Sequence, residues 1–212
     1  MDIIIAGVGG QGTVLASRAL AQAAVEIGIT VITSETIGMA QREGVVQSHV
    51  RLGREEIGPL IPDGAADLII GFEPAEAARA VVKAKPNASA LVNTSAIMPF
   101  TVALGTSKYD PEGIIAYLEK TLGSVIKINA TETAVQAGNH RAMNSVMLGA
   151  VSALNLLPVP GEAILRALLA MVKPAYRELN EKAFNLGCGL GQSLNPVLRF
   201  ISRGPDLLVV RK

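Results

Sequence analysis

The chain has very few residues of the kinds that build disulfide frameworks or iron–sulfur sites. Its 212 residues include a single cysteine, Cys188, and no tryptophan. A disulfide within the chain is therefore excluded, and so is an iron–sulfur cluster held by four cysteines of this chain. Cys188 lies in the segment NLGCGLG, where we interpret it as a small buried apolar residue rather than a reactive thiol.

Charged residues are also scarce. They make up 17% of the chain, against about 25% in an average soluble domain. Lys and Arg number 19 and Asp and Glu 18, so no basic excess is available for binding nucleic acid. Two interpretations of so little charge stay open: another subunit covers part of the surface, or the chain is a compact domain with a large core.

Long apolar runs are missing as well. The longest apolar region, VMLGAVSALNLLPVP, is interrupted by Ser152, Asn155 and Pro158 and is too short to span a bilayer. No basic segment precedes the first apolar stretch, so we expect no signal peptide. The sequence predicts a cytoplasmic protein with no membrane partner.

What the chain does have is an alternation of short apolar runs and helical patterns. This alternation predicts a three-layer α/β/α fold, with a Rossmann-like, mostly parallel sheet and helices on both faces. A third extended segment, residues 45–52, follows the second without a helix between them, which departs from simple alternation. No repeat or linker divides the chain, so residues 1–212 are predicted to form one domain. The predicted strands are residues 2–6, 29–35, 45–52, 66–72, 89–93 and 124–129.

The C-terminal third is predicted to be helical. One long helix is expected over residues 131–157, capped by Thr131, and further helices are expected to begin at Pro160 and Pro174. The tail, about residues 188–212, is interpreted as an added strand or an arm onto a partner. Four polar residues of the long helix recur every fourth position and would share one ridge, facing either solvent or a cleft: Glu132, Gln136, His140 and Asn144.

A glycine-rich turn follows the first predicted strand. Gly7, Gly9 and Gly12 match the pattern G-x-G-x-x-G between a strand and a helix, which is typical of loops that bring phosphate close to the backbone. Glu35 ends the second strand, where dinucleotide-binding proteins carry the acid that binds the ribose. Binding of NAD or FAD and a tight turn without a ligand are both consistent with this spacing. Gln11 could donate to a phosphate or bind a neighbouring loop.

A longer pattern resembles the gamma-type subunit, or domain, of 2-oxoacid:ferredoxin oxidoreductases, and most of all the small subunit of indolepyruvate oxidoreductases. It combines GVGGQG (7–12), SETIGMAQREGVVQSHVRLG (34–53) and NEKAFNLG (180–187). Two positions depart from the family pattern: Ile37 stands where a histidine is frequent, and Glu43 replaces a glycine. The matching residues of the second segment are Glu35, Gly38, Ala40, Gln41, Arg42, Gly44, Val46, Ser48, Val50 and Arg51.

The resemblance implies oxidative decarboxylation of a 2-oxoacid to an acyl-CoA, with electrons passing to ferredoxin. The family uses thiamine diphosphate, Mg and [4Fe–4S] clusters. This chain lacks the cysteines and a G-D-G…N segment, so these cofactors are expected on a larger catalytic partner subunit. The chain is then an accessory subunit with no catalytic residue of its own, and alone it could form a homodimer. A stand-alone NAD(P)-binding oxidoreductase and a non-catalytic scaffold are the alternatives.

The candidate binding residues lie in two loops. The loops are expected to meet at the carboxyl ends of the first two strands and there to hold CoA phosphates or cover the partner's thiamine site. Arg42 is interpreted either as an anion-binding residue or as an ion-pair partner of Glu35 or Glu43. Ser48 and His49 point to opposite faces of a strand, which excludes a nucleophile–base pair. The candidate residues are Gly7, Gly9, Gly10, Gln11, Gly12, Gln41, Arg42 and Gly44, and no metal ligand is predicted.

Overall fold

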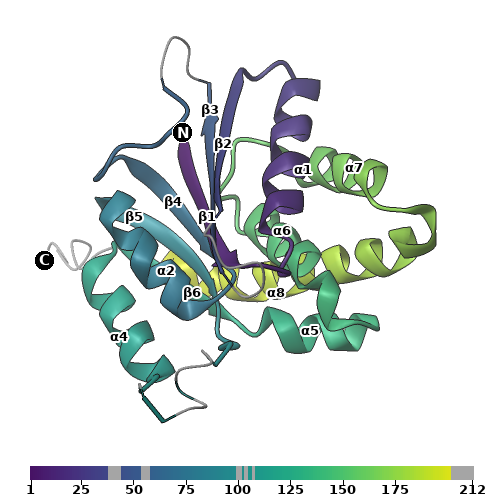
Figure 1. The fold of residues 1–212 in the computed structure, drawn as a ribbon. Helices are drawn as coiled ribbons and strands as arrows, with labels where there is room; N and C mark the ends of the chain where they lie inside the picture. Colours follow the sequence, from purple (N-terminus) through teal and green to yellow (C-terminus); the bar gives the residue numbers. More distant parts are fainter. Residues whose placement is uncertain (38–43, 54–57, 99–101, 103–104, 107, 202–212) are drawn as a thin grey trace, which may run out of the picture.

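A six-stranded mixed sheet forms the centre of the molecule (Figure 1). The computed structural model describes residues 1–37, 44–53, 58–98, 102, 105–106 and 108–201. The strand order is β2-β3-β1-β4-β5-β6, in which β1, β4, β5 and β6 are parallel neighbours. The strands are β1 (Asp2–Val8), β2 (Val31–Ile37), β3 (Val45–Leu52), β4 (Ala66–Gly71), β5 (Ala84–Asn93) and β6 (Ser124–Ile128).

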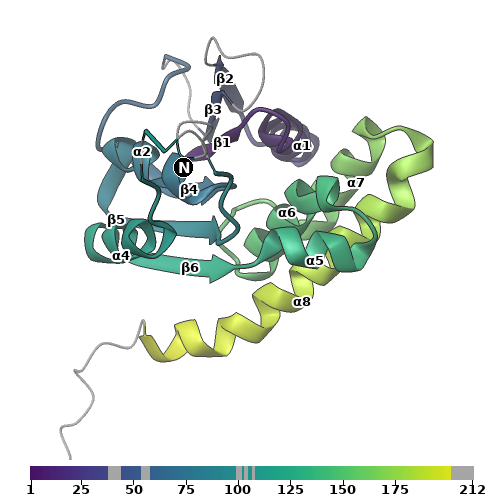
Figure 2. The ribbon, with the colours of Figure 1, turned by 60° about the horizontal axis from the view of Figure 1, so that its bottom comes forward.

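Helices cover both faces of this sheet, as predicted (Figures 1 and 2). Side chains alternate along each strand, so Ile3 and Ile5 of β1 face one helical layer and Ile4 faces the other. The first layer contains α1 (Thr13–Glu26), α5 (Ala130–Ala137), α6 (Met143–Ala153), α7 (Gly161–Met171) and α8 (Arg177–Ile201). The second layer contains α2 (Pro74–Ala80) and α4 (Pro111–Thr121).

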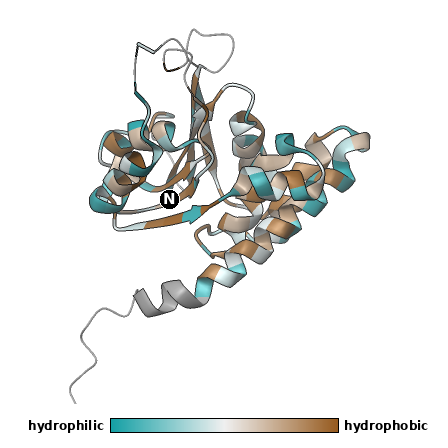
Figure 3. Ribbon diagram, turned by 90° about the horizontal axis from the view of Figure 1, so that it is seen from below, coloured by the Kyte–Doolittle hydropathy of each residue, from teal (hydrophilic) through white to brown (hydrophobic). Residues whose placement is uncertain are grey.

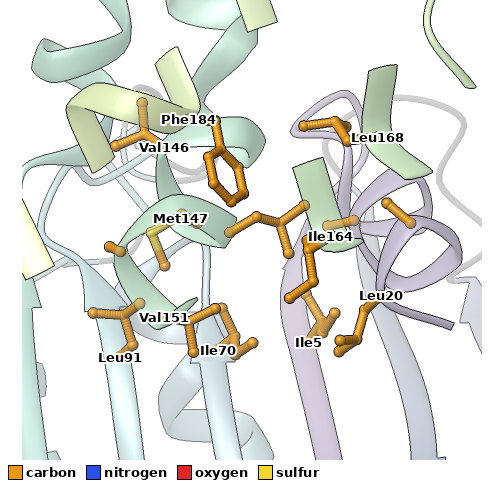
Figure 4. Packing of buried hydrophobic residues seen from close by; sticks show 14 of the residues in the cluster. Ile5, Leu20, Ile70, Leu91, Val146, Met147, Val151, Ile164, Leu168 and Phe184 are labelled. Atoms are coloured by element: carbon orange, nitrogen blue, oxygen red, sulfur yellow. The ribbon is translucent and has the colours of Figure 1, made fainter. Parts of the chain in front are cut away.

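The larger core lies between β1, β4 and β5 and the first helical layer (Figure 4). Ile5, Ile70 and Leu91 point from the strands toward this layer, and each is fully buried. Met147 of α6 and Phe184 of α8 lie above them, so α6 is enclosed between the sheet and α8. The hydropathy colouring shows brown residues in the strands and mixed colours along the covering helices (Figure 3).

The third extended segment is inserted between the first two strands. β3 pairs antiparallel with both β1 and β2, so β1 and β2 run in the same direction but are not neighbours. The sequence indicated that this region is irregular because no helix separates β2 from β3. It did not indicate that β3 would occupy the place beside β1 that a simple β1–α1–β2 unit gives to β2.

The single long helix predicted over residues 131–157 is wrong. α5 is capped by Asn129, whose side chain accepts a hydrogen bond from the Glu132 N–H, and it ends at Gly138, which has a φ of 131°. A short 3-10 helix, η2 (His140–Ala142), leads into α6. Because the chain turns here, the predicted polar ridge does not exist: His140 is exposed, whereas Asn144 is only 3% exposed.

Pro160 and Pro174 do mark helix starts. Pro160 precedes α7, and Pro174 begins the 3-10 helix η3 (Pro174–Tyr176) that leads into α8. The predicted tail is helical from residue 188 to Ile201, because α8 continues unbroken through it (Figure 2). An added strand is therefore excluded for that part, and residues 202–212 lie outside the described residues.

No helix among the described residues is both long and apolar enough to cross a membrane.

Candidate functional site

The glycine loop joins β1 to α1 in a tight turn. Gly10 and Gly12 have positive φ values of 96° and 79°, which other residue types rarely adopt. The Gly9 N–H donates to the Gly44 carbonyl at 2.8 Å, so the loop touches the end of the second predicted loop. α1 begins without a side-chain cap and without an acidic residue in its first turn. Its N-terminal dipole and unsatisfied N–H groups favour an anion there.

The side chain of Gln11 ties the glycine loop to the ends of β1 and β4. Its Oε1 accepts a hydrogen bond from the Val8 N–H at 2.8 Å, and its Nε2 donates to the Phe72 carbonyl at 3.0 Å. A Cβ atom at Gly7 would lie 2.7 Å from Gln11 Oε1, so glycine is required at position 7 to admit this side chain. Of the two roles the sequence allowed, the structure shows Gln11 bound to a neighbouring loop, with both ends of its amide engaged.

A cavity of about 330 Å³ lies beside the glycine loop, among the loops that follow β1, β5 and β6. Open α/β sheets characteristically bind ligands at these carboxyl ends. His140 and Arg141 of η2 contribute basic character, and no acidic side chain of the described residues lines the cavity. The cavity is lined by Gly9, Gly10, Gln11, Ser95, Ala96, Ile97, Thr131, His140, Arg141 and Met143.

Asn93 connects the end of β5 to the ends of its two neighbours, β4 and β6, beside this cavity. It is fully buried at the end of β5. Its Nδ2 donates to the Phe72 carbonyl and to Thr131 Oγ1, each at 3.0 Å, while its Oδ1 accepts from the Ala130 N–H at 3.0 Å. Phe72 O therefore receives bonds from both Asn93 and Gln11. The sequence analysis did not identify Asn93. The signal that could have indicated it is a polar residue at the end of the apolar run SALVN.

The structure places only part of the second predicted loop. Gly44 lies against Gly9, as the prediction that the two loops meet requires. Gln41 and Arg42 lie outside the described residues, as do Gly38, Ala40 and Glu43.

Glu35 is not positioned as in a dinucleotide-binding unit. It lies on the edge strand β2, which β3 separates from β1 and its glycine loop. Its carboxylate pairs with Arg18 of α1, with 3.4 Å between Oε1 and Nε. The ribose-binding role is therefore disfavoured, because the classical arrangement places that strand directly beside β1.

His49 and Ser48 have no catalytic arrangement. His49 is buried, and its Nδ1 accepts a hydrogen bond from the Ile61 N–H at 3.1 Å. Burial is the main cause that lowers the pKa of His49, with smaller contributions from the charges of Lys83 and Arg51. The neighbouring Arg51 forms a buried pair with Asp2 at 3.0 Å. His49 and Arg51 hold residues 58–61 against β3, because Arg51 also donates to the Gly58 and Leu60 carbonyls.

Comparison with known sequences identifies the family of this protein. The family described as pyruvate ferredoxin/flavodoxin oxidoreductase matches residues 2–190. The chain belongs to this family. Two relatives named indolepyruvate oxidoreductase subunit IorB support the assignment. The protein from Archaeoglobus fulgidus is 40% identical over 88% of this chain and 93% of its own length, and that from Methanothermobacter thermautotrophicus is 39% identical over 89% and 96%.

Solved structures share the fold. A keto/oxoacid ferredoxin oxidoreductase gamma subunit from Geobacter sulfurreducens is 25% identical, with a TM-score of 0.65 over 91% of this chain and 98% of that one. A 2-oxoglutarate:ferredoxin oxidoreductase from Magnetococcus marinus is 21% identical, with a TM-score of 0.70 over 92% of this chain and 31% of that one. The second likeness shows the fold alone.

Proposed function

We propose that this chain is the accessory, gamma-type subunit of a 2-oxoacid:ferredoxin oxidoreductase, and that the assembled enzyme acts on an aryl 2-oxoacid such as indolepyruvate. The observation that carries this proposal is the 40% identity to an indolepyruvate oxidoreductase subunit across nearly the whole of both chains. The match includes the glycine loop and Gly44, whose carbonyl accepts a hydrogen bond from the Gly9 N–H. We place the complex in the cytoplasm, with ferredoxin as its electron acceptor.

The redox cofactors belong on a larger catalytic partner under this proposal. A single cysteine cannot ligate a [4Fe–4S] cluster, and the chain has no G-D-G…N segment for magnesium and thiamine diphosphate. A partner interface would also explain why so hydrophobic a chain carries so little charge. The isolated chain is then inactive toward 2-oxoacids.

The cavity beside the glycine loop fits a phosphate group of coenzyme A. A Cβ at Gly10 would meet no atom within 4 Å, so the backbone there faces open space that a ligand can enter. The uncapped start of α1 and the side chains of His140 and Arg141 are matched to a negative charge. Gln41 and Arg42 are further candidates, since their loop ends at Gly44 beside Gly9.

Coenzyme A, when bound, supplies the thiol that accepts the acyl group. The residues of this chain would bind and orient the phosphate end of that molecule, and Arg141 would balance its charge. Gln11 and Asn93 would act indirectly, because they fix the loops against the Phe72 carbonyl and keep the cavity open.

Purification of the tagged chain from its native cell tests the accessory role. We expect a larger partner that contains iron and thiamine diphosphate, and ferredoxin reduction that requires both an aryl 2-oxoacid and CoA. In that complex, Arg141→Gln is expected to raise the KM for CoA about tenfold with little change in kcat. The matched control is Arg166→Gln, which removes an exposed arginine of α7.

The stand-alone alternative makes the opposite prediction. A chain that purifies without a partner, binds NAD(H) tightly in isothermal titration and oxidises a 2-oxoacid unaided would overturn the proposal. A stable homodimer that does not dissociate when the catalytic subunit is added would contradict it too.

A further inference from the structure

A second cavity, of about 360 Å³, adjoins η2, whose Arg141 also lines the glycine-loop cavity. It is enclosed by the start of α1, the passage from η2 into α6, and the turn between α7 and α8. Arg141 lines both cavities, but the remaining walls differ. A volume of this size suits a small organic molecule.

Asn144 forms part of the wall of this cavity, and its amide oxygen lacks a hydrogen-bond partner. The residue is 3% exposed, and its Oδ1 is buried without a donor in the described part of the chain. Gly12 packs against it, since a Cβ at Gly12 would lie 2.8 Å from Asn144 Nδ2. A buried amide oxygen without a partner destabilises a protein, and a ligand that donates a hydrogen bond to it removes this cost. Rotation about χ2 exchanges the donor and acceptor of the amide, so it can bind either kind of ligand atom.

The other walls combine positive charge with an apolar surface. Lys173 and Arg141 are exposed, and no acidic side chain of the described residues lines the cavity. Leu15 contributes an apolar wall, while Tyr176 and Met171 present exposed aromatic and thioether groups. Flat rings pack favourably against such groups.

We propose that this cavity is a binding site for a small organic anion that carries a flat ring. Lys173 and Arg141 bind the carboxylate or phosphate group, Tyr176 and Met171 contact the ring, and the amide of Asn144 hydrogen-bonds a polar atom at the edge of the ring. The site shares Arg141 with the glycine-loop cavity to which the proposed function assigns CoA, but its other walls are its own, and it does not depend on that assignment.

Isothermal titration of the full chain tests the site with three probes. Indole-3-acetate and AMP each combine a ring with an anionic group, and their relative affinity shows whether a carboxylate or a phosphate is preferred. Indole-3-acetamide retains the ring of the first probe but not its charge, and we expect it to bind at least tenfold more weakly than indole-3-acetate.

Two variants locate the bound probe. Asn144→Leu replaces the amide with an apolar group of similar size, and we expect binding at least tenfold weaker with an unchanged or higher Tm. Lys173→Gln is expected to weaken the anionic probes severalfold without affecting indole-3-acetamide. Lys182→Gln, an exposed lysine of α8 outside this cavity, is the matched control and should bind as the unaltered chain does.

Failure of both anionic probes to bind, or full affinity in Lys173→Gln, overturns the proposal. If Asn144→Leu does not fold, Lys173→Gln still tests the proposal, because this substitution changes only an exposed side chain. The readout is binding to this chain and not turnover. A chain that binds the probe but recruits no catalytic partner therefore contradicts only the proposed function, whereas the reverse result contradicts only the second site.

Discussion

Gly12 adopts a left-handed backbone conformation directly beside a buried side chain. Replacement by alanine introduces both backbone strain, about 1–2 kcal/mol, and a contact with Asn144. We expect Gly12→Ala to lower the free energy of unfolding by roughly 2–4 kcal/mol in urea titrations.

Gly28 provides the matched control for Gly12. It has a nearly equal φ, 81° against 79°, but a Cβ there would meet no atom within 4 Å. Gly28→Ala should therefore show the backbone strain alone, about 1–2 kcal/mol. Equal destabilisation by the two variants would show that the contact with Asn144 contributes nothing.

Asn93 is the second residue on which the candidate site depends. Asn93→Ala leaves the buried Ala130 N–H and the half-buried Thr131 Oγ1 without this partner. We expect a loss of about 2–4 kcal/mol in the free energy of unfolding, measured by urea titration. Asn87→Ala, at an exposed position of the same strand, should change stability by less than about 0.5 kcal/mol. A loss below about 1 kcal/mol at position 93 would contradict this account.

At the scale of elements, α6 and α8 pack with their backbones in close approach. A Cβ at Gly149 would clash with the Phe184 carbonyl, and one at Gly187 would clash with the Val146 carbonyl. Gly191 is similarly close, because a Cβ there would lie 2.7 Å from the Ala150 carbonyl. The small residues that the sequence places along these helices thus permit the enclosure of α6 between the sheet and α8.

Two glycines of α8 should respond in opposite directions to alanine. Gly187→Ala forces the helices apart, and we expect a loss of about 1–3 kcal/mol or more. Gly189 is exposed, and a Cβ there would meet no atom within 4 Å, so Gly189→Ala should gain about 0.5–1 kcal/mol from helix propensity. Thermal unfolding followed by circular dichroism measures both. A rise in Tm for each variant would show that the helices do not approach closely at Gly187.

The elements also show where sequence reasoning reached its limit. Alternating apolar residues identified β3, but a strand pattern carries no information about which neighbour the strand pairs with, so its insertion beside β1 was not predictable. The helix break at Gly138 did have a signal, the dipeptide Gly138-Asn139, which is typical of turns. The apolar pattern continues across it because α5 and α6 bury their faces in one core, and this continuity favoured a single helix.

For the whole molecule, the fold class and the family were predictable because the glycine loop and the segment after β2 form a long, specific pattern. The candidate site was only partly predictable. The spacing of Gly7, Gly9 and Gly12 indicated the turn, but the engagement of Gln11 with Phe72 depends on contacts between strands distant in the sequence. Asn93 binds the same Phe72 carbonyl, so its role could not be predicted from the sequence either.

Stability of the whole chain should depend on pH through His49. Its Nδ1 accepts the Ile61 N–H, and burial together with the charges of Lys83 and Arg51 disfavours the protonated ring, so its pKa in the folded state lies below the ordinary 6.5. As the pH falls below about 6.5, the unfolded chain binds a proton that the folded chain does not, and stability decreases at no more than about 1.4 kcal/mol per pH unit. Well above that pH the ring is neutral in both the folded and the unfolded chain, so His49 no longer makes the free energy of unfolding depend on pH.

Urea unfolding between about pH 5 and 8 measures this dependence on His49. The loss at low pH should appear in the unaltered chain and in His140→Gln, whose altered residue is exposed, but not in His49→Gln. His140 is the matched control because it is the other histidine of the chain. The same pH profile in His49→Gln would mean that another group is responsible, since glutamine cannot take up a proton in this range.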